Sequence, residues 1–328
     1  MNSLIQFRLL TGLCLALLAS AAVGAQLSGG LSGPVLGYVV DGHEGRLRPL
    51  LGILGSATVG APVDAGFALS QVWILDATHV MAATDASPEV LVLDLDASSE
   101  SRAVISGVPG NPSDAVTSLQ GMSAAFYYAD AHEIRIVTGL PQRPVVSHSF
   151  NLSQPGRLTH IAVSNDGALL VYSVAENDGD ALYGWSASSE TVRLLMSANA
   201  ISAVAITASG AAIVADGGTN EVFAIWDAGG AAVRQFLAGE QDGVSNPVGF
   251  AVSAGNRIFI ANAGTDTVIG LDANGRNLNT MECNCALSGV APLRDSVFRL
   301  RDRIHRTIFL LDASSAEERI LFVPPPKD

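Results

Sequence analysis

Lysine is almost absent from this chain of 328 residues, because it occurs only once, at Lys327. That position is next to the C-terminus, so no lysine is placed for Schiff-base chemistry. Charged residues of all kinds make up only 15% of the sequence, and acids outnumber bases to give a formal net charge of −13. Such a surface repels phosphate backbones and anionic lipid headgroups, so we expect no nucleic-acid partner.

Long apolar runs are missing beyond the N-terminus. Residues 1–25 are typical of a secretory signal, with Arg8 before an apolar run at 9–18 and small residues before Gln26. The run is too short to span a bilayer, and no later segment is long and apolar enough to do so. We therefore expect an exported protein of the bacterial periplasm or cell exterior, without a membrane span.

Cysteine is rare as well. Cys14 falls within the signal, which leaves Cys283 and Cys285, separated by one residue. An oxidising compartment permits a local disulfide, although a one-residue spacer strains the ring. Two reduced thiols or an intermolecular bridge remain as alternatives. Because nothing nearby in the sequence supplies further ligands, we expect no metal at this pair.

What the sequence has instead is a repeat of about 45 residues, which extends from Val72 to the C-terminus. Apolar anchors recur at intervals of 43 to 48 residues, and a second apolar strand is expected eight residues after each anchor. In four copies a third strand is expected eighteen residues after the anchor, and turns such as Ser164-Asn-Asp-Gly separate the runs. The anchors are Val72, Val116, Ile161, Val204, Phe250 and Phe298.

A unit of this length cannot bury its own apolar faces, so the copies must pack against one another. We predict an all-β fold, a single β-propeller of four-stranded blades over residues 26–323, with a Pro-rich tail at 324–328. Six blades are favoured: five full copies, and a composite blade in which strands at 35–40 and 46–51 complete the one that the C-terminus begins. Seven blades stay open as an alternative, because the Gly-rich stretch 54–67 has room for a hidden strand.

The segment Phe259-Ile-Ala-Asn-Ala-Gly-Thr-Asp-Thr-Val-Ile-Gly-Leu-Asp resembles a repeat named for its Tyr-Val-Thr-Asn motif, which occurs in bacterial and archaeal β-propellers. Residues 213–227 are similar, with Asp216 in the place of the motif Asn. The other copies keep only the strand pattern. The resemblance implies a propeller of the lactonase-like and NHL-like kind, and such propellers serve as surface-layer proteins, binding scaffolds and, in relatives, lactonases.

Acidic residues gather in the loops between the second and third strands, which open on one face of a propeller. The six loops hold 13 acids and no Lys or Arg, whereas we assign Arg257, Arg301, Arg303 and Arg306 to the opposite face. We predict that this acidic face binds a basic partner, a ligand or a cation. The alternative is that acids merely suit turns and keep strand ends solvated. The residues next to the third strands are Glu89, Glu133, Asp180, Glu221, Asp266 and Glu318.

Calcium is the one metal that we consider, because Asn177-Asp178-Gly179-Asp180 resembles half of a calcium loop. It lacks the later Gly and the distal Glu of an EF-hand, so we interpret it as a solvated loop insertion rather than a calcium site. We therefore assign no metal ligand and no cofactor from the sequence.

An enzyme needs acid, base or nucleophilic groups that converge. The six histidines fall at different offsets of the repeat, and only His160 starts a first strand near the channel, where Arg157 and Asp295 could approach it. No Gly-x-Ser-x-Gly elbow supports Ser-His-Asp catalysis. We expect a monomeric, non-catalytic binding or scaffold propeller, and the alternative is a lactonase-like hydrolase that uses His160, Arg157 and Asp295.

Overall fold

The computed structural model describes residues 33–41, 45–96, 101–304, 307–315 and 317–325. The signal predicted at 1–25, together with His43, His305 and Arg306, lies outside these residues. From Pro34 on, the described residues form one compact unit with 27 strands in seven antiparallel sheets and one 3-10 helix, η1 (Glu240–Asp242). Within the described ranges no helix is long and apolar enough to cross a membrane.

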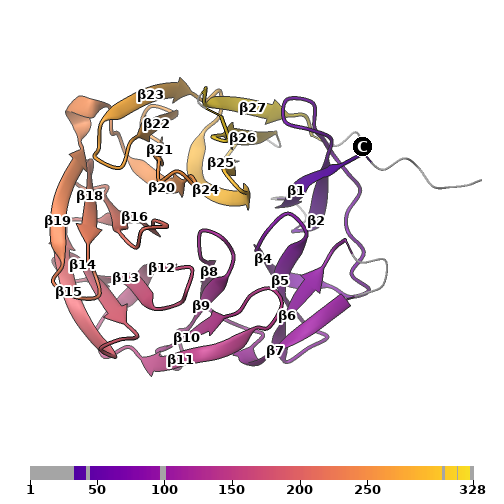
Figure 1. Ribbon diagram of the computed structural model, residues 1–328, viewed down its shortest axis with the longest axis horizontal. Coiled ribbons are helices and arrows are strands. Elements are labelled where there is room, and N and C mark those ends of the chain that lie inside the picture. Colours follow the sequence, from indigo (N-terminus) through magenta and orange to yellow (C-terminus); the bar gives the residue numbers. More distant parts are fainter. Residues whose placement is uncertain (1–32, 42–44, 97–100, 305–306, 316, 326–328) are drawn as a thin grey trace, which may run out of the picture. The chain divides into compact units, whose positions relative to one another are not determined.

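Each sheet is built from consecutive strands, so each sheet is one blade, and the blades follow one another round a ring in chain order (Figure 1). The first strand of a blade is the innermost and the last is the outermost. Blade 1 comprises β1 (Val35–Val40), β2 (Leu47–Leu51) and β3 (Thr58–Val59). Blade 2 comprises β4 (Leu69–Ile74), β5 (His79–Thr84), β6 (Glu89–Asp94) and β7 (Ser101–Pro109). Blade 3 comprises β8 (Asp114–Thr117), β9 (Ser123–Tyr128), β10 (Glu133–Thr138) and β11 (Val145–Asn151).

Blades 4 to 7 have four strands each, as blades 2 and 3 do. Blade 4 comprises β12 (Arg157–Val163), β13 (Leu169–Glu176), β14 (Gly179–Ser186) and β15 (Thr191–Ala198). Blade 5 comprises β16 (Ile201–Ile206), β17 (Ala212–Asp216), β18 (Glu221–Trp226) and β19 (Val233–Ala238). Blade 6 comprises β20 (Pro247–Val252), β21 (Ile258–Asn262), β22 (Thr267–Leu271) and β23 (Asn277–Glu282). Blade 7 comprises β24 (Leu287–Arg294), β25 (Val297–Asp302), β26 (Ile308–Asp312) and β27 (Arg319–Val323).

An apolar cluster lies at every junction between neighbouring blades, seven in all. At the junction of blades 2 and 3, for example, Trp73 meets Phe126 edge to face with ring centroids 5.8 Å apart. Every residue of β9 and β17 is buried, because a neighbouring blade covers each side of these strands. This two-sided burial explains why the middle strands are continuous apolar runs in the sequence.

The expectation of six blades is wrong, because the ring has seven. The sixth anchor, Phe298, lies in β25, the second strand of blade 7. The first strand of that blade, β24, contains Val290, and offsets of eight and eighteen residues from Val290 fall at Phe298 in β25 and Ile308 in β26. Gly289 and Pro292 conceal β24 in the sequence, because both residues are depleted in strands.

The expected composite blade is also wrong. The N-terminal strands form a sheet of their own, and β27 pairs with β26 in a complete blade 7. The hidden strand is β3, within the stretch 54–67. Blade 1 instead closes the ring by side-chain packing: Leu50 belongs to the apolar cluster shared with blade 7, and Leu47 to the cluster shared with blade 2.

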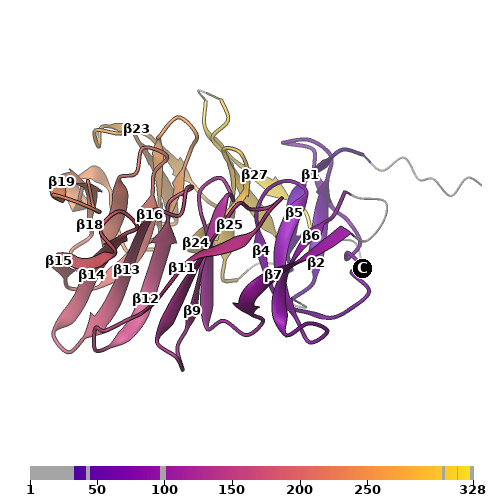
Figure 2. The ribbon, with the colours of Figure 1, turned by 60° about the horizontal axis from the view of Figure 1, so that its bottom comes forward.

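Successive strands run in opposite directions between the two faces of the ring (Figure 2). The loops between second and third strands therefore open on the same face as the connections from one blade to the next. We call this the top face. The loops after first and third strands open on the other face, which we call the bottom face.

Candidate binding face and central channel

Five of the six predicted acids lie on the top face, and Glu318 does not. Glu318 precedes β27, the fourth strand of blade 7, so it lies on the bottom face, where its carboxylate forms an ion pair with Arg257. The six predicted acids therefore do not share one face, and the five on the top face form an arc over blades 2 to 6. The residues of this arc are Glu89, Glu133, Asp180, Glu221 and Asp266.

The arginines assigned to the bottom face are also divided between the faces. Arg257 lies there, between β20 and β21, but Arg301 lies near the top end of β25 and Arg303 follows that strand. Blade 7 thus interrupts the acidic face with positive charge. Across blades 2 to 6 the top loops, which extend over 84–89, 129–133, 175–180, 216–221 and 262–266, still hold ten acids and no Lys or Arg.

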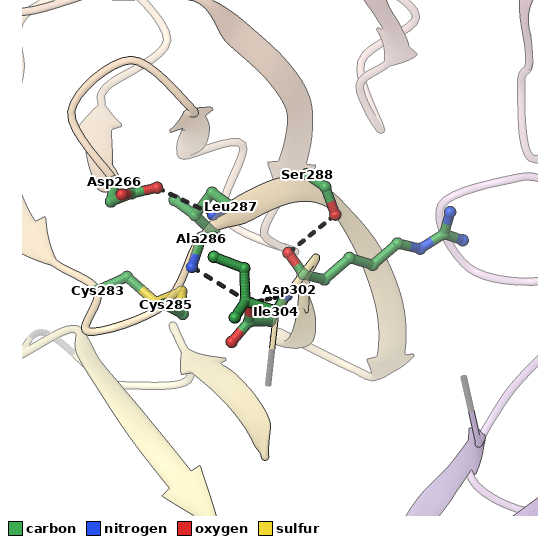
Figure 3. Close-up of a disulfide and its surroundings, with 9 residues drawn as sticks. Asp266, Cys283, Cys285, Ala286, Leu287, Ser288, Asp302 and Ile304 are labelled. Atoms are coloured by element: carbon green, nitrogen blue, oxygen red, sulfur yellow. Dashed lines mark hydrogen bonds between the residues drawn. A yellow bond between two sulfur atoms is a disulfide. The ribbon is translucent and has the colours of Figure 1, made fainter. Parts of the chain in front are cut away.

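Two acids of the arc join their blade to the next one. The carboxylate of Asp180 accepts a hydrogen bond of 2.7 Å from the backbone N–H of Ile201, and that of Asp266 accepts one of 3.0 Å from Leu287. Ile201 and Leu287 are the first residues of β16 and β24, the inner strands of the following blades. Figure 3 shows the contact of Asp266 with Leu287 beside a disulfide. These acids therefore have a structural role.

The three glutamates of the arc have local partners too. Glu133 forms an ion pair of 2.8 Å with Arg135 and accepts a hydrogen bond from Ser149, and the hydrogen bonds from these side chains lower the pKa of Glu133. Glu89 accepts a hydrogen bond of 2.6 Å from the backbone N–H of Gly107. Glu221 accepts one of 3.1 Å from the Thr219 hydroxyl.

The motif position that carries the family resemblance has a structural role as well. Asp216 and Asn262 end the second strands of blades 5 and 6, and both are buried. Asp216 accepts hydrogen bonds from the backbone N–H groups of Asn199 at 2.9 Å and Ala200 at 3.1 Å, in the connection that enters its own blade. Asn262 accepts one of 3.2 Å from Ser245 in the equivalent connection. A side-chain oxygen here satisfies backbone groups that no strand partner reaches.

Other acids of the top loops are free to meet a partner. Asp85, Asp130 and Asp178 lie in the turns at the tips of the loops in blades 2, 3 and 4, and all three are exposed. Within the described part of the chain their carboxylates form no hydrogen bond or ion pair. The repeat pattern did not identify these three residues, because it selects the acids directly before the third strands. Their signal in the sequence is an acid inside a turn.

The loop that resembles half of a calcium site borders a cavity on the top face of blade 4. Residues 177–180 line this cavity of about 540 Å³ together with Pro155 and Ser197. One carboxylate oxygen of Asp180 is already bonded to Ile201. Among the described residues, no three His, Cys, Asp or Glu side chains gather as a metal site would require.

The cysteine pair is a disulfide in the structure. Cys283 and Cys285 are bonded in the connection from β23 to β24, and both are buried in the cluster between blades 6 and 7 (Figure 3). The adjoining backbone is held by Asp302, whose carboxylate accepts hydrogen bonds from Ala286 at 3.3 Å and Ile304 at 2.8 Å. The bridge therefore fastens a connection on the top face.

His160 lies in β12 and connects blades 4 and 5 rather than facing a catalytic partner. Its Nδ1 is 3.3 Å from the Ser173 hydroxyl, and its ring bonds to the backbone of Ser202. Burial lowers the pKa of His160, although the carboxylates of Asp180 and Asp114 oppose this shift. The surroundings of His160 therefore favour the neutral form of its imidazole.

The trio proposed for a hydrolase is not assembled. Arg157 and His160 are on the same inner strand, but Asp295 lies in the turn between β24 and β25 on the bottom face, where it pairs with Arg294 at 3.3 Å. The carboxylate within electrostatic range of His160 at the channel is instead Asp114, at the start of β8. Asp114 keeps contact with solvent, yet the surrounding protein raises its pKa.

The central channel contains a cavity of about 240 Å³, bordered by the inner strands of blades 1, 2, 3 and 7. Its wall is mainly apolar and includes Val72, Val116 and Val290. The charged residues of the wall are Arg299 and Arg301, both from β25. The wall therefore combines apolar surface with two guanidinium groups.

Comparison with known proteins agrees with this fold. No protein-family model matches the chain, and no curated protein matches it. Among solved structures, virginiamycin B lyase from Staphylococcus aureus is similar at a TM-score of 0.55 and 12% identity, over 78% of this chain and 84% of that one. A streptogramin B lyase is similar at 0.55 and 11%, over 78% and 83% of the chains. Kuenenia stuttgartiensis hydrazine synthase is similar at 0.54 and 15%, over 82% and 90%.

At such identities the likeness shows the β-propeller fold alone. The lyases and the synthase do not transfer an activity to this chain. The Tyr-Val-Thr-Asn repeat, which no family model supports, stays a prediction.

Proposed function

We propose that this chain is an exported, non-catalytic binding propeller whose acidic top face, over blades 2 to 6, engages a basic partner protein in the periplasm or at the cell exterior. The observation that carries the proposal is the distribution of charge. The top loops of five consecutive blades contain ten acids and no Lys or Arg. A continuous field of one sign steers an oppositely charged partner toward one face and suppresses wrong partners.

The unpaired acids make this face available for binding. Asp85, Asp130 and Asp178 are exposed on three neighbouring blades and form no ion pair within the described residues. Lys or Arg side chains of a partner can therefore bind them without breaking an existing contact. The packed blades hold the loops in place, so little conformational entropy is lost on binding.

The proposal is tested by affinity capture from the native envelope with two triple variants. The first carries Asp85→Asn, Asp130→Asn and Asp178→Asn on the top face. The control carries Asp96→Asn, Glu190→Gln and Glu317→Gln, three exposed acids in the bottom-face loops after third strands. Both variants lose three negative charges, so any difference in the proteins that they capture reflects the position of the charges and not their number.

Quantitative mass spectrometry then compares what co-purifies with each protein. We expect a basic protein that the wild-type chain and the bottom-face variant retain and that the top-face variant loses by about tenfold or more. Equal recovery by both variants, or partners without a basic surface, would contradict the proposal.

A further inference from the structure

Arg299 and Arg301 present two positive charges to the central cavity of a chain whose net charge is −13. They lie two residues apart in β25, so both side chains leave the strand on the same side. Burial lowers the pKa of Arg299, and the repulsion between the two guanidinium groups lowers it further, although the carboxylate of Asp41 opposes the shift. Two guanidinium groups are thus held close together at the wall of the cavity.

Small residues of the inner strand let both arginines reach the channel. Arg301 is paired across the sheet with Gly289, and Arg299 with Ala291, both in β24. The Cδ of Arg301 lies 3.6 Å from the position that a Cβ on Gly289 would occupy, so its side chain passes over the glycine. Larger residues in β24 would separate these guanidinium groups from the cavity.

The two guanidinium groups keep donors for a further acceptor. Arg299 donates to the backbone carbonyl of Val40 at 2.6 Å, and neither arginine forms an ion pair with a described carboxylate. Asp114 is close enough to Arg301, and Asp41 to Arg299, to interact electrostatically, but neither carboxylate forms a hydrogen bond or ion pair with its arginine. A guanidinium presents five N–H donors in a planar fork that matches the oxygens of a carboxylate or phosphate.

The other residues of the cavity wall indicate which chemical group the anionic ligand carries besides its charge. Val72, Val116 and Val290 are half-buried and border the same cavity of about 240 Å³. That volume lies below the roughly 300–1,000 Å³ of pockets for drug-sized ligands, so the occupant is small. Apolar side chains beside a paired cationic site favour a molecule with an anionic end and an apolar body.

We propose that the central cavity binds a small organic anion, whose carboxylate or phosphate is held by Arg299 and Arg301 and whose apolar part packs against the inner strands. This site is separate from the acidic top loops and does not depend on the function proposed for them. The Arg301 side chain supplies the main recognition, because Arg299 is already bonded to Val40.

The test uses the full mature chain and three probes at constant ionic strength: benzoate, phenyl phosphate and the neutral benzamide. Isothermal titration calorimetry measures affinity for the wild type, Arg301→Gln and Arg303→Gln. Arg303 is an exposed arginine that follows the same strand and does not line the cavity, so its variant matches the change in charge. Circular dichroism checks that each variant is folded, and Arg301→Lys replaces Arg301→Gln if the latter is not.

We expect at least one of the two anions to bind the wild type and Arg303→Gln, and benzamide to bind neither. The affinity of Arg301→Gln for that anion should be at least about tenfold weaker, since charge-assisted hydrogen bonds are lost. With Arg301→Lys the affinity should also fall, because the planar fork is lost while the charge stays. The proposal is overturned if neither anion binds the wild type, or if the Arg301 variant binds as well as Arg303→Gln.

Discussion

Asp266 and Leu287, which belong to neighbouring blades, are joined by a hydrogen bond of 3.0 Å from the backbone N–H of Leu287 to the Asp266 carboxylate. Asp180 and Ile201 repeat the relationship two blades earlier, at 2.7 Å. In both pairs the donor is the first residue of an inner strand, which has no strand partner for this N–H. An acid next to a third strand thus fixes where the following blade begins.

Asp266→Ala and Asp180→Ala should each lower the free energy of unfolding by about 1–2 kcal/mol, because a half-buried N–H loses its partner. Urea denaturation followed by circular dichroism measures this change. Asp178→Ala, in a turn and exposed, is the matched control, and its effect should stay within about 0.5 kcal/mol. If all three variants unfold at the same urea concentration as the wild type, the carboxylates do not join the blades.

Leu50→Ala should destabilise the ring by about 2–5 kcal/mol, because Leu50 is fully buried where blade 1 packs on blade 7. The exposed Val145 of β11 provides a comparison, and Val145→Ala should cost less than about 0.5 kcal/mol. The urea midpoints of the two variants are the readout. Equal midpoints would mean that blade 1 does not close the ring.

The disulfide predicts the absence of free thiols in the mature, unfolded protein. Cys283 and Cys285 are the cysteines that remain after the expected signal is removed, and they are bonded to each other. A thiol titration in denaturant should therefore detect no thiol before reduction and two after it. Two thiols before reduction, or a dimer that a reductant separates, would contradict the intramolecular bridge.

His160 should make the fold less stable in mild acid. Burial lowers the pKa of His160 in the folded protein, so below about pH 6.5 the unfolded chain binds this proton more readily. Its contribution to stability is therefore present above pH 6.5 and falls as the pH drops through that value. His160→Asn should flatten the loss of unfolding free energy between about pH 7 and 5.5, measured by urea denaturation at each pH.

His132→Asn is the control for this pH series, because His132 lies in an exposed turn with positive φ, a conformation that Asn accepts. If His160→Asn and the wild type lose stability equally over the range, burial of His160 does not control this part of the pH profile.

Much of the fold could be predicted from the regular spacing of apolar residues. Five anchors, from Val72 to Phe250, lie on inner strands, because the middle strands that follow them are buried on both sides and keep their apolar character. Blade 7 departs from this spacing, since Gly289 and Pro292 weaken the β pattern of β24. The strand β3 has two residues, too few to leave a pattern. These two strands explain the error in blade number and in closure.

Less of the candidate site could be predicted from the sequence. The repeat register placed five acids on the correct face, but their hydrogen bonds to Ile201, Leu287 and other neighbours depend on how successive blades meet. Glu318 was misplaced together with the strands of blade 7. The convergence of Arg299 and Arg301 on the channel could not be seen, because it depends on the pairing of β25 with β24 across Gly289 and Ala291.

The most direct test of the central claim, that the acidic top face binds a basic partner, is the affinity of the purified chain for an oligo-arginine peptide at two salt concentrations. Calorimetry compares the wild type with the top-face and bottom-face triple variants, which have equal net charge. The account predicts that the top-face variant binds about tenfold more weakly than the bottom-face variant, and that raising the salt narrows the difference. Equal affinities of the two variants at low salt would contradict it.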